Sequence, residues 1–278
     1  MKLFESFKAW LARLAENPFV VSAAQVEARR SSLTRWLNGY GVYLAILVLP
    51  LSLCSSAASL MEGDSLEGAV RVTAVIVALV QVVYASIRAV SSTATTIVSE
   101  RQRGTLLTLA LSKINSADCA DGVAAAGVRP LLRELTILWP LSLLICLAVG
   151  GDLYSAVMLW AISCLMAIFF AYNGVYYSAI SRDAAQASNS GLMNVVTLLL
   201  LTPFIFLMGG FLAGPLWLIH PFAGLSLAFF GPGLPQGGDW FNLMFIRWWT
   251  ILVLPVYVLM IRDARRRATR ALERVTLT

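Results

Sequence analysis

Six stretches of about 20 mostly apolar residues constrain this chain more than any other feature, because a helix that crosses a bilayer needs about that length. They are residues 40–60, 70–90, 131–149, 154–180, 191–212 and 241–261. With 59% hydrophobic and 13% charged residues, a water-soluble domain of 278 residues could not cover its apolar surface. The sequence therefore predicts an all-α, polytopic membrane protein with six transmembrane helices. A cytosolic enzyme, a disordered regulator and a secreted disulfide scaffold are excluded.

Lysines and arginines predict the orientation of these spans. The connections 61–69, 150–153 and 213–240 contain neither residue, whereas the N-terminal segment and the C-terminal tail carry six each. Basic residues favour the cytoplasmic side of a membrane. We therefore expect both termini and the connection 91–130 on the cytoplasmic side. The net charge of +6 reflects this topology signal rather than a nucleic-acid-binding face.

The pattern divides the chain into three parts. Residues 1–38 are expected to form cytoplasmic interfacial helices, the first of them amphipathic over 1–16 and unlike a cleaved signal peptide. A second helix is expected to begin at Asn17-Pro18, since Asn caps helices and Pro suits their first position. Residues 39–262 are expected to form the six-helix transmembrane domain, and 263–278 a basic cytoplasmic tail. The apolar, Pro-rich stretch 213–240 predicts a re-entrant outer segment.

Residues needed for several kinds of chemistry are missing. The chain has one histidine, His220, and three lysines, none of which follows a glycine. Neither a His-pair metal site nor a P-loop can be built from them. The four cysteines lie far apart, without a C-x-x-C spacing. We expect no catalytic residue, no bound cofactor and no metal in this chain. If the chain is an active pump, its energy therefore comes from another polypeptide.

Polar residues within the predicted spans are few. Glu134 lies beside Arg133 near the start of the third stretch, and we interpret them as a local pair at the membrane interface. Tyr172, Tyr176 and Tyr177 are interpreted as an interfacial aromatic belt. The lack of a carboxylate at mid-depth argues against a proton-coupled carrier.

The connection 91–130 carries the most specific signal. It contains SERQRGTLLTLAL over residues 99–111, in which a charged cluster ends at Gly104, a residue that can stop a helix. A short helix with Thr105 as its cap would follow, with an apolar stripe of Leu106, Leu109 and Ala110. That stripe could lie on the membrane or on its own bundle. It could also dock into a groove of a cytoplasmic partner.

This string resembles the E-R-x-x-G-T-L-x-x-L signature of permease subunits of type-2 ABC exporters, found after their second span. The helix that begins at Asn17-Pro18 is similar to the N-terminal interfacial helix of that family. The apolar outer segment before the last span resembles the family's re-entrant helices. Six spans with both ends inside also match.

The resemblance implies a transmembrane permease of an ATP-driven exporter in a bacterial inner membrane, working as a dimer with a second permease copy or homologue. A P-loop ABC ATPase, which holds ATP and Mg, would bind below each permease and drive alternating access. The resemblance also implies three sets of residues. The coupling helix near 99–113 would contact the ATPase through Glu100, Arg101, Arg103, Gly104, Thr105, Leu106 and Leu109. The N-terminal interfacial helix would include Asn17, Pro18, Glu27, Arg29 and Arg30, and the outer gate would include Pro215, Trp217, His220 and Pro221.

Two other classes of function remain open on the residues alone. A membrane scaffold that recruits a cytoplasmic protein would also explain the docking helix, but not the re-entrant segment. A channel or secondary carrier would need no ATPase. Apolar spans and an aromatic outer segment lean toward hydrophobic or amphipathic cargo.

Overall fold

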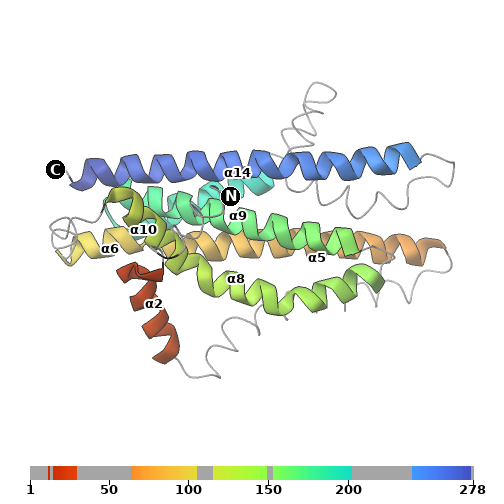
Figure 1. Ribbon diagram of the computed structural model, residues 1–278, viewed down its shortest axis with the longest axis horizontal. Helices are drawn as coiled ribbons and strands as arrows, with labels where there is room; N and C mark the ends of the chain where they lie inside the picture. Colours follow the sequence, from red (N-terminus) through yellow and green to blue (C-terminus); the bar gives the residue numbers. More distant parts are fainter. Residues whose placement is uncertain are drawn as a thin grey trace.

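A computed structural model of the chain describes residues 12, 15–29, 64–104, 115–148, 153–201 and 240–276. Every regular element within these ranges is a helix (Figure 1), which confirms the all-α prediction for this part of the chain. The elements are α2 (Pro18–Arg29), α5 (Asp64–Thr93), α6 (Thr96–Gln102), α8 (Ser116–Ala148), α9 (Leu153–Ile180), α10 (Ala184–Val195), the π-helix η2 (Val196–Leu201) and α14 (Trp240–Thr276).

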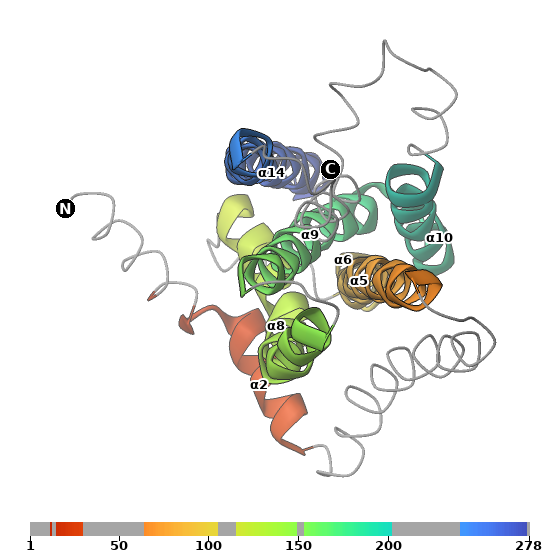
Figure 2. The same ribbon diagram turned by 90° about the vertical axis from the view of Figure 1, so that its right-hand side faces the viewer.

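Helix α9 lies at the centre of a bundle of long helices. It packs against α5, α8, α14 and α10, and Figure 2 shows these helices around it. In Figure 1, α6, the beginning of α8 and the C-terminal part of α14 lie together at one end, which we call the α6 end. Helix α2 packs against α8.

The helices are longer than the apolar stretches that predict them. Helix α8 begins at Ser116 rather than at 131, and α14 runs on to Thr276 rather than stopping at 261. The predicted inner connection is therefore helical over much of its length, and the predicted basic tail continues α14 up to Thr276. The first predicted span lies outside the described residues, and so does the predicted re-entrant stretch 213–240 except for Trp240, which begins α14.

Among the described residues, one helical stretch, Ala156–Ile180 in α9, is long and apolar enough to cross a membrane. Its side chains are buried on several sides, as expected for a helix surrounded by others. Phe170, Met166 and Val175 are among those that are almost fully enclosed.

Polar side chains between α5 and α9 bond to groups within the bundle. Gln81 donates to the Ser163 hydroxyl over 3.2 Å, and Ser163 donates to its own helix at the Leu159 carbonyl over 2.7 Å. The Thr93 hydroxyl lies 3.0 Å from the Ala89 carbonyl and 3.1 Å from the Ala171 carbonyl of α9. Because an unbonded polar group in an apolar interior is costly, these bonds favour one register of α5 against α9.

Three glycines let neighbouring helices approach the end of α5. A Cβ at Gly174 of α9 would meet the Thr93 hydroxyl oxygen, and it would lie 3.1 Å from the Val90 carbonyl. A Cβ at Gly127 of α8 would clash with the Thr93 methyl group, and one at Gly191 of α10 would lie 2.7 Å from the Val90 side chain. The last turn of α5 is therefore enclosed by three helices, each of which lacks a side chain at the contact.

We predict that Gly174→Ala destabilises the protein, although Ala favours a helix over Gly by about 1 kcal/mol. The added methyl group meets backbone atoms as well as Thr93, and overpacking of this kind costs about 1–3 kcal/mol. Thermal unfolding in detergent should show a lower midpoint. Ala185→Leu, which adds bulk at an exposed position of α10, is the control and should leave the midpoint unchanged. A midpoint at or above wild type for Gly174→Ala would contradict the close approach.

Candidate functional site

Helix α6 begins against a serine of a different helix. Its own preceding residue, Thr95, makes no side-chain capping bond. Instead, the Ser178 hydroxyl of α9 accepts hydrogen bonds from the backbone N–H groups of Ile97, at 2.9 Å, and Val98, at 3.2 Å. The first N–H groups of a helix have no partner within the helix. Ser178 therefore does across two helices what a capping residue usually does within one.

The other end of α6 is also attached to α9. The Arg101 guanidinium donates to the backbone carbonyl of Ser181, just after α9 ends. Helix α6 then stops at Gln102, and Gly104 follows with a φ of +75°, which confirms the prediction that this glycine ends the helix. One end of α6 is thus bonded to α9 and the other to the residue that follows α9, so small movements of α9 would be passed on to α6.

The residues predicted to couple to a partner are placed in part. Glu100 and Arg101 are half-buried near the end of α6, whereas Arg103 and Gly104 are exposed. Thr105, Leu106 and Leu109 lie outside the described residues, as do Arg30 and the predicted outer-gate residues Pro215, Trp217, His220 and Pro221. Glu27 and Arg29 belong to α2, but the structure describes only their backbone.

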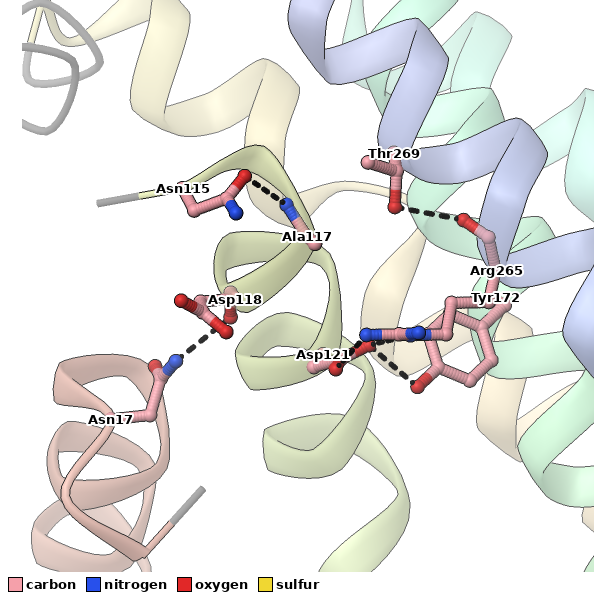
Figure 3. Close-up of polar contacts among 8 residues, drawn as sticks. All are labelled: Asn17, Asn115, Ala117, Asp118, Asp121, Tyr172, Arg265 and Thr269. Carbon is pink, nitrogen blue, oxygen red and sulfur yellow. Dashed lines mark hydrogen bonds and ion pairs between the residues drawn. The ribbon is translucent and has the colours of Figure 1, made fainter. Parts of the chain in front are cut away.

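Asn17 begins α2, as predicted, and also fastens it to α8. Its side-chain oxygen accepts from the Phe19 N–H over 3.1 Å, and its amide group donates to the Asp118 carbonyl over 2.8 Å (Figure 3). Pro18 occupies the first helical position. Gly122 allows this contact, because a Cβ there would clash with the Asn17 side chain.

A buried carboxylate joins three helices close to the α6 end, and sequence reasoning missed it. Arg265 of α14 donates to both oxygens of Asp121 of α8, with its Nε at 2.6 Å from Oδ1 and its Nη2 at 2.7 Å from Oδ2 (Figure 3). The Tyr172 hydroxyl of α9 donates to Oδ1 over 2.9 Å. Asp121 is 3% exposed, and the Arg265 side chain is 43% exposed.

The geometry of this cluster explains its electrostatics. A two-pronged contact between guanidinium and carboxylate is among the stronger polar interactions in proteins. The hydrogen bonds to Asp121 raise the pKa of Arg265 above its ordinary value, because they stabilise the charged guanidinium. Tyr172 is buried and bonded to Asp121, so its interpretation as an interfacial belt residue was wrong.

A second tyrosine of the predicted belt also makes a contact between helices. The Tyr177 hydroxyl accepts a hydrogen bond from the side-chain amide of Asn194 in α10 over 2.8 Å. Helix α10 itself starts at Asp183, whose carboxylate caps the Gln186 N–H. Tyr172 and Tyr177 thus connect α9 to helices on different sides.

Glu134 has a partner that its sequence neighbours do not indicate. One of its carboxylate oxygens lies 4.0 Å from Nη2 of Arg88 in α5, and its side chain is 14% exposed. The carboxylate therefore faces α5, within the range of the second predicted span. Within the described residues, no three His, Cys, Asp or Glu side chains gather in a way that could hold a metal ion.

Comparison of the sequence with protein-family models and with curated proteins finds no match. The geometry of α6 and of the helices that hold it is therefore the basis for a functional proposal, together with the sequence pattern.

We predict that Ser178→Ala loosens α6. The substitution removes the acceptor for two N–H groups, and an orphaned buried donor costs about 1–3 kcal/mol. Hydrogen exchange followed by mass spectrometry should show faster exchange across α6. Ser86→Ala is a matched control, because its equally buried hydroxyl donates only to the Val82 carbonyl of its own helix. Equal protection of α6 in the two variants would contradict the capping role.

We predict that Arg265→Leu lowers the free energy of unfolding by about 3 kcal/mol, because it leaves the buried Asp121 charge without its cation. The double change Asp121→Asn/Arg265→Leu should regain part of that loss, since no uncompensated charge remains. Arg266→Leu alters the adjacent, exposed arginine and should cost less than about 0.5 kcal/mol. If the single and double variants unfold at the same denaturant concentration, the buried charge is not the cause.

Proposed function

We propose that this chain is the transmembrane permease subunit of an ATP-driven exporter, similar to the type-2 ABC family. It would form the translocation pathway, while a separate P-loop ATPase binds ATP and Mg and supplies the energy. The proposal starts from the SERQRGTLLTLAL pattern at residues 99–111, which resembles the coupling signature of that family.

The observation that carries the proposal is the attachment of α6 to α9 at both ends. A coupling segment works only if a push on it moves the helices around the pathway. Ser178 and Arg101 tie α6 to α9, and α9 packs against α5, α8, α10 and α14. The predicted coupling segment near 99–113 begins within the last residues of α6, so its movement would be transmitted to the central helix. Two arrangements of the bundle with different affinity for the ATP-bound partner would then give alternating access.

The proposed placement in the membrane follows the distribution of basic residues. The α6 end would face the cytoplasm, with α2 on the membrane surface against α8 and the C-terminal part of α14 below the bilayer. We propose that the chain crosses a bacterial inner membrane six times and pairs there with a second permease copy or homologue. The re-entrant stretch 213–240 would form the outer gate.

A secondary carrier is the alternative that one observation favours. Glu134 faces Arg88 between two predicted spans, and ionisable groups at such positions often belong to ion pathways. A carrier without a cytoplasmic partner would not explain why α6 is attached to α9. A membrane scaffold would use α6 but would not need the buried contacts that link it to the whole bundle.

The test is a mild-detergent purification of the tagged chain from its native membrane, with partners identified by mass spectrometry. We predict that wild type recovers a P-loop ATPase in equal amount, and that Leu106→Asp and Glu100→Lys lose it at least tenfold, by charging an apolar contact and reversing a charge. Leu106→Met and Glu100→Gln are the conservative controls. All four variants should insert into the membrane normally.

The possible outcomes separate the three functions. Loss of the ATPase in the charged variants alone supports the exporter. A clean preparation of wild type without any ATPase, together with ion currents or proton-coupled uptake in vesicles, supports the carrier. Recovery of a cytoplasmic protein without a P-loop supports the scaffold.

A further inference from the structure

Helix α14 continues beyond the sixth predicted span, which ends at residue 261, as an amphipathic helix. Its inward-facing residues are small or apolar except for Arg265, and Ala264, Ala268 and Leu272 are buried. Its outward-facing residues include five exposed arginines: Arg262, Arg266, Arg267, Arg270 and Arg274. We call these five residues the arginine face.

The arginine face occupies one side of the helix. At 100° per residue the five arginines fall within an arc of about 140°, and the buried residues lie on the opposite arc. Two exposed carboxylates share the arc, and one of them, Asp263, pairs with Arg267 over 3.0 Å. The arc remains positive, because the arginines outnumber the carboxylates.

Arg265 differs from the other arginines of this segment and fixes how they are presented. Its side chain turns inward and donates to Asp121, which also accepts a hydrogen bond from the Tyr172 hydroxyl (Figure 3). Helix α14 is thereby bonded to α8 and α9 within the same turn from which the arginine face starts. The face is therefore held in one orientation and is not a flexible basic tail.

We propose that the arginine face is a docking surface for an acidic surface of the cytoplasmic ATPase, in addition to the coupling segment. This inference rests on the proposed function. The guanidinium group suits such a contact, because it binds carboxylates through two parallel hydrogen bonds and is only weakly hydrated.

The length of the face favours a protein partner over lipid headgroups. Arg262 and Arg274 are twelve residues apart, which corresponds to about 18 Å along the helix axis. The headgroup layer on one side of a bilayer is only about 5–8 Å thick. Helix α14 runs alongside α9 without turning aside (Figure 1), so Arg270 and Arg274 would lie deeper in the cytoplasm than headgroups reach.

Position also favours the partner that is proposed for the coupling segment. The C-terminal part of α14 lies at the same end of the molecule as α6 (Figure 1), and the coupling segment is predicted near 99–113, at the end of α6. A single ATPase below the bundle could contact the coupling segment through apolar side chains and the arginine face through charge.

The experiment uses the full chain in nanodiscs and the purified ATPase that the wild-type chain recovers from its membrane. The variant Arg266→Glu/Arg270→Glu/Arg274→Glu reverses the part of the face farthest from the membrane. We expect its affinity for the ATPase in phosphatidylcholine nanodiscs to fall at least tenfold, and the wild-type affinity to weaken as salt is added. The matched control Arg266→Lys/Arg270→Lys/Arg274→Lys keeps the charge but loses the two parallel hydrogen bonds, so it should weaken binding clearly less than the glutamate variant does.

Each other outcome overturns the inference in its own way. If the glutamate variant binds the ATPase as tightly as wild type does, the arginine face is not a docking surface, but the proposed exporter function still stands. If the affinity of the glutamate variant for the ATPase falls only in nanodiscs that contain phosphatidylglycerol, the arginine face binds anionic lipid instead. If the wild-type chain recovers no ATPase at all, the proposed function fails and the docking surface fails with it.

Discussion

The close approach of α5 to α9 at Gly174 decides where α6 can lie. Because Gly174 has no side chain, the Thr93 hydroxyl reaches the Ala171 carbonyl, and α5 ends directly against α9. One turn farther along α9, Ser178 is then within reach of the first N–H groups of α6. A side chain at position 174 would push α5 away and leave those groups without an acceptor. The path of the chain toward residue 104 thus depends on a contact between backbones.

Two kinds of polar contact hold the α6 end together, and they differ in strength and purpose. The contacts between Ser178 and α6 are single hydrogen bonds between neutral groups, each worth about 1 kcal/mol net, and Arg101 adds one bond to a neutral carbonyl. The cluster around Asp121 is charged and two-pronged, and it joins α8, α9 and α14. The helices α8, α9 and α14 are therefore firmly tied, while α6 is attached by bonds that can be exchanged at low cost. This difference would suit α6 if it transmits movement to the more rigid group of α8, α9 and α14.

The sequence predicts local features of this molecule well and contacts between helices poorly. The start of α2 at Asn17-Pro18 and the end of α6 before Gly104 follow from short-range backbone chemistry, and both are confirmed. The partners of Asp121 and Ser178 depend on the relative rotation of three helices, which no local pattern encodes. Tyr172 illustrates this, since its spacing suits an aromatic belt whereas its hydroxyl bonds a buried carboxylate. The coupling role of every residue in the segment 99–113 stays a prediction, as does the outer gate.

The cap on α6 has a consequence for how the helix behaves when the bundle moves. A helix that carries its own capping residue keeps its first turn wherever it goes, but α6 takes its cap from Ser178 of another helix. If α9 slid by one turn toward its own C-terminus, Gly174 would stand where Ser178 stands, and glycine offers no side-chain acceptor. The first turn of α6 would then fray rather than tilt. The contact between the two helices would therefore transmit movement in the register seen here and lose its capping bonds in the next one.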